Sequence, residues 1–554
     1  MRYANKISDN AKAWFDGQIV NVRKYFSEKH TPINNYSANL AAFLKRDSIY
    51  WLCVICTALL SYGFTLTNAT IGVDDEILRH YIDGHGLLMQ GRWGQTVLTR
   101  IVDTQFFLPF WRKFLGLITH VFALTFLTGL FNKYSRGRFD DTTATIFTCV
   151  ALSFPLLAEV FVFKMTVIEV GLSLFLVALS VYLASRWVMD NKHFGYAFLS
   201  IVLLGFTLGM SDNTVLRYFS IAMSLLLLDA LFSDNNKRKL LQMFIDIIKF
   251  LLIFMCALLL SNFFASMLQA YFDVTYVSQR STHISYNFGS IADFAYSFVN
   301  FARQFVRVRV LFPGTHDLVS FLKWFSTVSI IVICTCCAFI LRRLNIFFAG
   351  VATAASAYIM LIILGDATPM LRIMSTFSTT IAFSIGLIYI VFNNIVIAKY
   401  VKAKQLIIVA VVLLVLTQSR DMNHTFFLDY QRYQRDVMVM HSIINDLGGR
   451  QRTKPIVFVG LLTHGFPDRN PNIHVIGITL FNWDRWSNEL CSFRLNRFFA
   501  MHGFPFQSAY GLDSDVIALQ VADMPSWPAY GYIREFEYYI IVMLGNSPRF
   551  GASP

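Results

Sequence analysis

Long apolar runs recur along this chain and constrain its fold more than any other feature of the sequence. A helix needs about 20 residues, at 1.5 Å each, to cross the ~30 Å hydrocarbon layer of a membrane. Runs near this length lie at residues 48–67, 114–132, 142–160, 166–187, 194–210, 214–232, 241–264, 318–341, 346–364, 373–398 and 405–418. The sequence therefore predicts a polytopic membrane protein with about eleven transmembrane helices.

Composition supports this interpretation and excludes others. Hydrophobic residues make up 55% of the chain and charged residues only 15%, whereas soluble domains carry about a quarter charged residues. The net charge of +13 does not indicate a nucleic-acid partner, because the basic residues punctuate the apolar runs instead of forming one stripe. All cysteines except Cys491 lie inside apolar runs, so neither a disulfide framework nor a metal site is expected.

The basic residues also predict how the helices are oriented. Residues 1–47 are rich in Lys and Arg, and every second connection after them is basic as well. Since cytoplasmic loops carry the excess of Lys and Arg, we expect the N-terminus inside and the C-terminus outside, as in a bacterial inner-membrane protein. Residues 1–47 are too long for the basic region of a cleaved signal peptide, so the first apolar run is expected to stay as a helix.

Three stretches on the expected outer side are too long to be simple connectors, namely 68–113, 265–316 and 420–554. The last of them opens with a helix-like run, and short β-rich runs follow at Pro455–Gly460, Asn472–Gly477, Val516–Val521 and Tyr538–Leu544. We therefore expect an all-α polytopic membrane protein with a small α/β C-terminal domain. Its parts would be a cytoplasmic segment 1–47, a membrane domain 48–419 and a periplasmic domain 420–554.

An acidic motif, Gly72-Val73-Asp74-Asp75-Glu76, directly follows the first apolar run. Adjacent carboxylates beside a membrane surface suit a general base, because mutual repulsion and partial burial raise the pKa of one of them. The same residues would also serve as the cap and acidic first turn of a following helix. The sequence alone leaves both interpretations open.

A second motif, Gly91-Arg92-Trp93-Gly94, lies in the same outer stretch. A guanidinium is a bidentate donor to phosphate, and an indole offers a flat apolar face to a sugar ring. The alternative is an interfacial anchor of the aromatic belt, which also combines Trp with Arg.

Several cations on the outer side break the charge rule, and such residues often mark the path of an ion or substrate. They are Lys164, Arg217, Arg280, Arg303, Arg307, Arg309 and Arg372. Lys164 is better explained by a buried ion pair with Glu159 and Glu169. Arg303 and Arg307, four residues apart, fit a solvated helix face as well as they fit a functional role. Asp212 and Asn213 form a short polar tip that is more often a turn than a ligand. We find no P-loop and no Ser/His/Asp arrangement of recognisable spacing.

Taken together, these motifs resemble the GT-C superfamily of integral-membrane glycosyltransferases, and within it the serotype-converting O-antigen glucosyltransferases of bacteria and phages. The similarity is carried by Val73–Glu76, Gly91–Trp93, Pro369–Arg372, Phe427–Tyr433, Tyr530–Tyr532 and Val542–Leu544. One departure is Ser211-Asp212-Asn213, where the family pattern leads us to expect a Tyr-Gln pair.

The resemblance implies a reaction and a set of site residues. The donor would be undecaprenyl-phosphate glucose, the acceptor a sugar hydroxyl of lipid-linked O-antigen, and the displacement inverting. Asp74 or Asp75 would be the base, and the lipid phosphate would be bound by Arg92, Arg303, Arg307, Arg309 and Arg372. Glu76, Trp93, Asp212 and Asn213 would contact the sugar or the acceptor. Paired acids suit Mg²⁺, but the chemistry requires no cofactor. A flippase and a polyprenyl-phosphate glucosyltransferase would supply the donor.

Two other classes share parts of this pattern. A lipid or oligosaccharide transporter or flippase should carry ionisable residues at mid-membrane and often two related halves, and no half-repeat is visible here. An O-antigen polymerase or ligase has many helices and an Arg-rich outer loop, but it would not need the long tail after residue 420.

Overall fold

The computed structural model describes most of the chain. The described residues are 45–78, 85–102, 108–211, 213–233, 240–274, 292, 296, 299, 316–359, 373–392, 401–448, 454–462, 478–483, 488–509 and 511–545. Five of the expected site residues lie outside them, namely Asp212, Arg303, Arg307, Arg309 and Arg372. The β-rich run Asn472–Gly477 lies outside them as well.

Eight helices in the described part of the chain are long and apolar enough to cross a membrane. They are α2 (Ser48–Thr67), α6 (Pro109–Tyr134), α9 (Val167–Val188, preceded by the 3₁₀ turn η3, Lys164–Thr166), α11 (Thr214–Phe232), α12 (Leu240–Tyr271), α14 (His316–Leu341), α17 (Phe377–Val391, preceded by η5, Ile373–Thr376) and α18 (Val401–Leu447). Three shorter apolar helices accompany them, α7 (Asp141–Leu152), α10 (Gly195–Leu208) and α15 (Leu344–Ser356). The chain is thus a mostly helical membrane protein.

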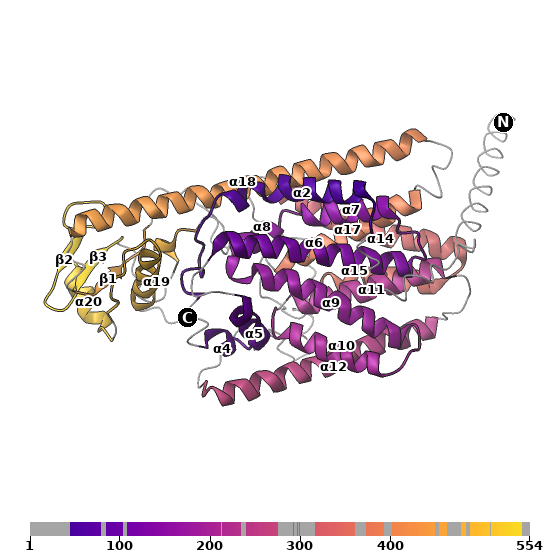
Figure 1. Ribbon diagram of the computed structural model, residues 1–554, viewed down its shortest axis with the longest axis horizontal. Helices are drawn as coiled ribbons and strands as arrows, with labels where there is room; N and C mark the ends of the chain where they lie inside the picture. Colours follow the sequence, from indigo (N-terminus) through magenta and orange to yellow (C-terminus); the bar gives the residue numbers. More distant parts are fainter. Residues whose placement is uncertain are drawn as a thin grey trace.

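Two of the predicted runs differ from the observed helices. The run 142–160 is divided into α7 and the short α8 (Leu157–Val162), because Pro155 cannot donate the backbone hydrogen bond that a continuous helix needs. The run 405–418 and the helix-like residues after it form one helix instead of two. This helix, α18, has 47 residues and is therefore about 70 Å long. Figure 1 shows it running along one edge of the bundle and on to the C-terminal strands.

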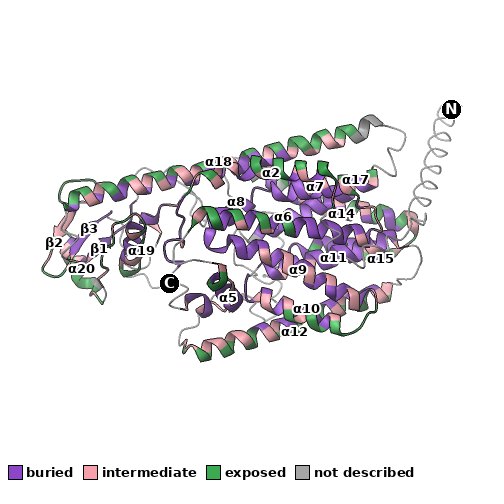
Figure 2. Ribbon diagram, in the orientation of Figure 1, coloured by how far each residue is buried: buried purple, intermediate pink, exposed green. Residues whose placement is uncertain are grey.

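The core lies among the central helices of the bundle. α9 contacts α6, α10 and α11, and Figure 2 shows these inner surfaces buried while α12 exposes much of its length. Small residues let the central helices approach closely. At Gly171 of α9, an added Cβ would lie only 2.2 Å from the Thr119 hydroxyl oxygen of α6.

The tail, which we define as residues 454–545, folds around a three-stranded sheet. β3 (Ile540–Met543) lies between β1 (Ile456–Val459), to which it is parallel, and β2 (Ile533–Glu535), to which it is antiparallel. The described part of the tail also contains the 3₁₀ turn η8 (Leu480–Asn482) and the helices α19 (Asn488–Met501) and α20 (Ser514–Val521).

The predicted strand Val516–Val521 is helix α20 instead. The Asp513 side chain caps its first turn by accepting from the Asp515 amide at 2.8 Å. Ile517 and Val521, four residues apart and so on one helical face, pack against β1 and β3. Two of the β-branched residues that suggested a strand, Ile517 and Val521, therefore lie on the buried face of a short helix.

Candidate functional site

The acidic motif forms a tight turn between α2 and α4 (Gly86–Met89), at the end of the bundle that faces the tail (Figure 1). Asp74 has a φ of 71°, a left-handed conformation that is uncommon outside glycine. The Gly72 amide donates to Asp75 Oδ2 at 2.7 Å and thereby closes the turn. A Cβ at Gly72 would lie 2.9 Å from the Val162 carbonyl oxygen, so the close approach of this turn to α8 requires glycine.

Asp75 anchors this turn to the membrane helices. Its Oδ2 accepts from Lys164 Nζ at 2.9 Å, and neither side chain is exposed. Lys164 also donates to the Val162 carbonyl oxygen at 3.1 Å. Lys164 is therefore in a buried ion pair, but with Asp75 and not with the predicted Glu159 or Glu169. Glu169 pairs with Arg112 instead, at 2.9 Å.

Asp74 and Glu76 point the other way, toward the tail, and both contact Arg494 of α19. Arg494 Nη2 donates to Asp74 Oδ1 at 2.6 Å, and Arg494 Nη1 donates to Glu76 Oε1 at 2.6 Å. The Asp74 side chain is 21% exposed, whereas that of Glu76 is fully buried. No described residue donates a hydrogen bond to Asp74 Oδ2.

Burial gives Glu76 an unusual affinity for a proton. Loss of hydration raises its pKa from 4.5 to about 8, and the neighbouring Asp74 charge acts in the same direction against the opposing pull of Arg494. Its Oε2 atom is buried without a hydrogen-bond partner in the described structure. Burial therefore affects the pKa of Glu76 more than the charge of Arg494 does.

The long helix α18 links the acidic turn to the tail through three charged residues. Arg432 donates to Asp429 Oδ1 at 2.8 Å, to Asp436 Oδ2 at 2.9 Å and to the Ile71 carbonyl oxygen at 2.8 Å. Asp429 Oδ2 accepts from the Thr70 hydroxyl at 2.9 Å. Since all three charges are almost fully buried, this network holds the chain just before the acidic motif against α18.

Asp436 extends the same network into the tail. It accepts from the Thr479 hydroxyl and, at 3.2 Å, from the Leu480 amide. The acidic turn is therefore bound on three sides: by Lys164 of the bundle, by α18 and by Arg494 of the tail.

The second motif joins α4 to α5 (Trp93–Val102): Gly91 and Arg92 precede α5, and Trp93 and Gly94 are its first residues. Arg92 is half-buried. The Trp93 indole is enclosed by helices α10 and α12. Its Nε1 donates to the Ser261 hydroxyl at 3.2 Å, and its ring contacts Phe206 and Phe264. A Cβ at Gly209 would lie 2.4 Å from Trp93 Nε1, so a glycine makes room for this indole. In this structure the Trp93 ring is buried between helices, and neither a sugar contact nor a place in the aromatic belt follows from that packing.

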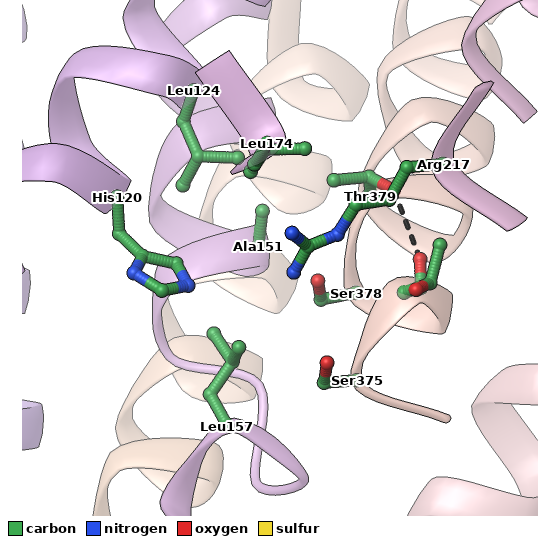
Figure 3. Close-up of a pocket in the computed structure, with 10 residues that line it drawn as sticks. His120, Leu124, Ala151, Leu157, Leu174, Arg217, Ser375, Ser378 and Thr379 are labelled. Carbon is green, nitrogen blue, oxygen red and sulfur yellow. Dashed lines mark hydrogen bonds between the residues drawn. The ribbon is translucent and has the colours of Figure 1, made fainter. Parts of the chain in front are cut away.

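Arg217 and Asn213 lie at the start of α11, and both are buried. Arg217 Nη1 donates to the Val170 carbonyl oxygen at 2.6 Å and to the Ser173 hydroxyl at 2.7 Å. Figure 3 shows its guanidinium facing His120 across a small cavity, with Ser375 nearby. The cavity has room for about one water-sized particle, so a hexose does not fit there.

A group of His, Cys, Asp or Glu side chains suited to a metal ion is not found among the described residues. In the acidic motif, the two acids that face outward are already bound by the Arg494 guanidinium.

The family model Glucosyl transferase GtrII matches residues 63–389, more than half of the chain. The chain belongs to the GtrII glucosyltransferase family. Comparison with curated proteins and with solved structures gives no significant match.

The GtrII match contains part of the site described above and leaves part of it out. The acidic motif, Arg92 and Lys164 fall inside residues 63–389, whereas α18 and the tail follow them. Arg494 is a site residue that the sequence does not predict, because its partners are 418 and 420 positions away and no local pattern marks it. Arg432 belongs to the Phe427–Tyr433 run that carried the resemblance, which was the one available signal for it.

Proposed function

We propose that this GtrII glucosyltransferase moves glucose from undecaprenyl-phosphate glucose to a sugar hydroxyl of lipid-linked O-antigen at the periplasmic face of a bacterial inner membrane. The observation that supports it best is the unequal environment of two neighbouring acids. Asp74 is partly exposed with Oδ2 available, while Asp75 is fully buried against Lys164. Of these two acids, the exposed Asp74 is therefore the one we assign as the base that takes the acceptor proton.

The reaction is a single displacement with inversion. The acceptor oxygen forms a bond to the anomeric carbon, its proton passes to Asp74 Oδ2, and the bond from that carbon to the phosphate oxygen breaks. The leaving group is undecaprenyl phosphate, on which negative charge develops. A β-linked donor then yields an α-glycoside.

Cations are needed where the leaving phosphate gains charge, because transition-state stabilisation is greatest there. Arg92 is the described candidate, and the family resemblance adds Arg303, Arg307, Arg309 and Arg372. Glu76, Trp93, Asp212 and Asn213 would shape the space for the sugar and the acceptor. Trp93 would do so through the helices it holds together, because its own ring is enclosed.

The sidedness rests on the charge distribution of the connections. The basic connections face the cytoplasm, which leaves the acidic turn and the tail on the periplasmic side. A donor flipped to the outer leaflet would present its phosphate at that level. Mg²⁺ has no required role in this scheme, and a flippase and a polyprenyl-phosphate glucosyltransferase would provide the donor.

The test is a transfer assay with the purified chain in liposomes. We expect glucose from labelled undecaprenyl-phosphate glucose to appear on lipid-linked O-antigen as an α-glycoside, identified by the anomeric coupling constant in NMR. A β-glycoside would contradict the single displacement. Movement of the labelled lipid across the bilayer without transfer would instead support the transporter alternative, and chain extension of the acceptor would support the polymerase alternative.

A further inference from the structure

The acidic turn depends on a residue that lies far from it in sequence and outside the GtrII match. Arg494 is almost buried, with 8% of its side chain exposed, and it contacts Asp74 and Glu76 at the same time. Its planar fork donates one N–H to each side chain, from Nη2 to Asp74 Oδ1 and from Nη1 to Glu76 Oε1, at 2.6 Å in both cases. Such a fork fixes the direction as well as the distance of its partners, which a lysine ammonium cannot do for two acids at once.

Asp74 needs such support because of its backbone. A left-handed non-glycine residue persists only where its surroundings hold it. On one side Asp75 ties the turn to Lys164. On the other side the contact made by the Asp74 side chain itself is the one with Arg494.

The position of Arg494 is in turn set by the fold of the tail. Two residues before it, the Ser492 hydroxyl accepts from the Phe458 amide of β1 at 2.8 Å. Two residues after it, the Asn496 amide nitrogen donates to the Ile456 carbonyl oxygen of β1 at 3.3 Å. The buried bonds from Asp436 to Thr479 and Leu480 join the same tail to α18. The guanidinium therefore reaches the acidic turn from a helix fixed on the sheet.

We infer that Arg494 is a positioning residue that aims the Asp74 carboxylate for sugar transfer, so that the tail completes the active site of the membrane domain. This inference rests on the proposed function, because it assumes that Asp74 takes the acceptor proton. The tail is then part of the active site, and the enzyme turns over only when the tail is docked on the acidic turn.

The test compares Arg494→Ala with Arg497→Ala, both on α19. Arg497 is exposed and stacks over Phe493, so its loss removes a similar side chain without touching the acids. We expect Arg494→Ala to lower kcat by about 100-fold with KM within about 3-fold, because a misaimed catalytic group loses rate more than binding. Arg494→Lys, which keeps one contact, should lie between, and Arg497→Ala should match the unmodified enzyme.

A second measurement is the transfer rate of Arg494→Ala with guanidinium ion added at millimolar concentration. The added ion should raise this rate only if Arg494 acts on the acids through its guanidinium group, and not if Arg494 merely stabilises the fold. We expect guanidinium to raise the kcat of Arg494→Ala by about 10-fold and to leave the kcat of Asp74→Asn unchanged. Thermal unfolding of each variant identifies any that fails to fold. If Arg494→Ala fails to fold, the kcat of Arg494→Lys is compared with that of Arg497→Ala instead. Arg494→Ala and Arg494→Lys both turning over within 3-fold of Arg497→Ala would overturn the inference, even if Asp74→Asn is inactive. Activity in Asp74→Asn would refute the proposed base instead.

Discussion

Asp75 and Lys164 form an ion pair in which Nζ and Oδ2 are 2.9 Å apart and neither side chain is exposed. Asp74, the preceding residue, faces the opposite way and keeps a fifth of its side chain exposed. Two acids that look equivalent in the sequence thus have different physical settings. Asp75 anchors the turn, and in the proposed mechanism Asp74 takes the acceptor proton.

The buried pair predicts a strong effect of removing one partner. Lys164→Met should lower the free energy of unfolding by about 3–5 kcal/mol, because it leaves a carboxylate buried without its counter-charge. Thermal or denaturant unfolding in detergent measures this change. Lys164→Met combined with Asp75→Asn should recover most of the loss. A single variant as stable as the unmodified protein would show that the pair does not hold the turn.

Glu76 predicts a dependence of stability on pH. Its pKa of about 8 in the folded protein exceeds the ordinary 4.5, so between these values the folded state keeps a proton that the unfolded state has lost. The free energy of unfolding should therefore fall as pH rises from about 5 to 8, by up to about 1.4 kcal/mol per pH unit, and level off above. Glu76→Gln should lack this component. Parallel stability curves for the two proteins across that range would contradict the prediction.

The helices were predictable because each depends on local composition. The run 48–67 coincides with α2, since apolar residues at membrane length have few other options. The predicted strand at Val516–Val521 was wrong because β-branched residues also suit the buried face of a capped helix. The acidic motif and Lys164 stood out as charges beside apolar runs. Arg494 did not, because an arginine on a soluble helix has no local feature that reveals partners more than 400 positions away.

The packing of Trp93 predicts that a single methyl group will disturb the second motif. In Gly209→Ala the new Cβ would lie 2.4 Å from the indole nitrogen, so the indole must move and shift Arg92 with it. We expect transfer activity to fall by about 10-fold or more. Gly195→Ala is the matched control, because no atom lies within 4 Å of a Cβ there. Equal activity of the two variants would show that the second motif is not part of the active site.

The proposed orientation predicts the labelling of introduced cysteines. Lys192 and Asp515 are both exposed, the first in the α9–α10 connection and the second on α20 of the tail. Both cysteines are introduced into a protein whose reactive native cysteines have been replaced. In spheroplasts, a membrane-impermeant maleimide should label Asp515→Cys directly and Lys192→Cys only after lysis. The reverse pattern would place the acidic turn on the cytoplasmic side and exclude the proposed donor leaflet.

The rate of sugar transfer by Asp74→Asn shows whether Asp74 is the base of the proposed glucosyl transfer. The variant keeps the size of the side chain and an oxygen for the contact with Arg494, but it cannot take the acceptor proton. With Asp515→Asn as the exposed control, we predict that kcat falls by at least about 100-fold while the thermal unfolding temperature stays within a few degrees. A folded Asp74→Asn enzyme that transfers glucose at the unmodified rate would rule out Asp74 as the base.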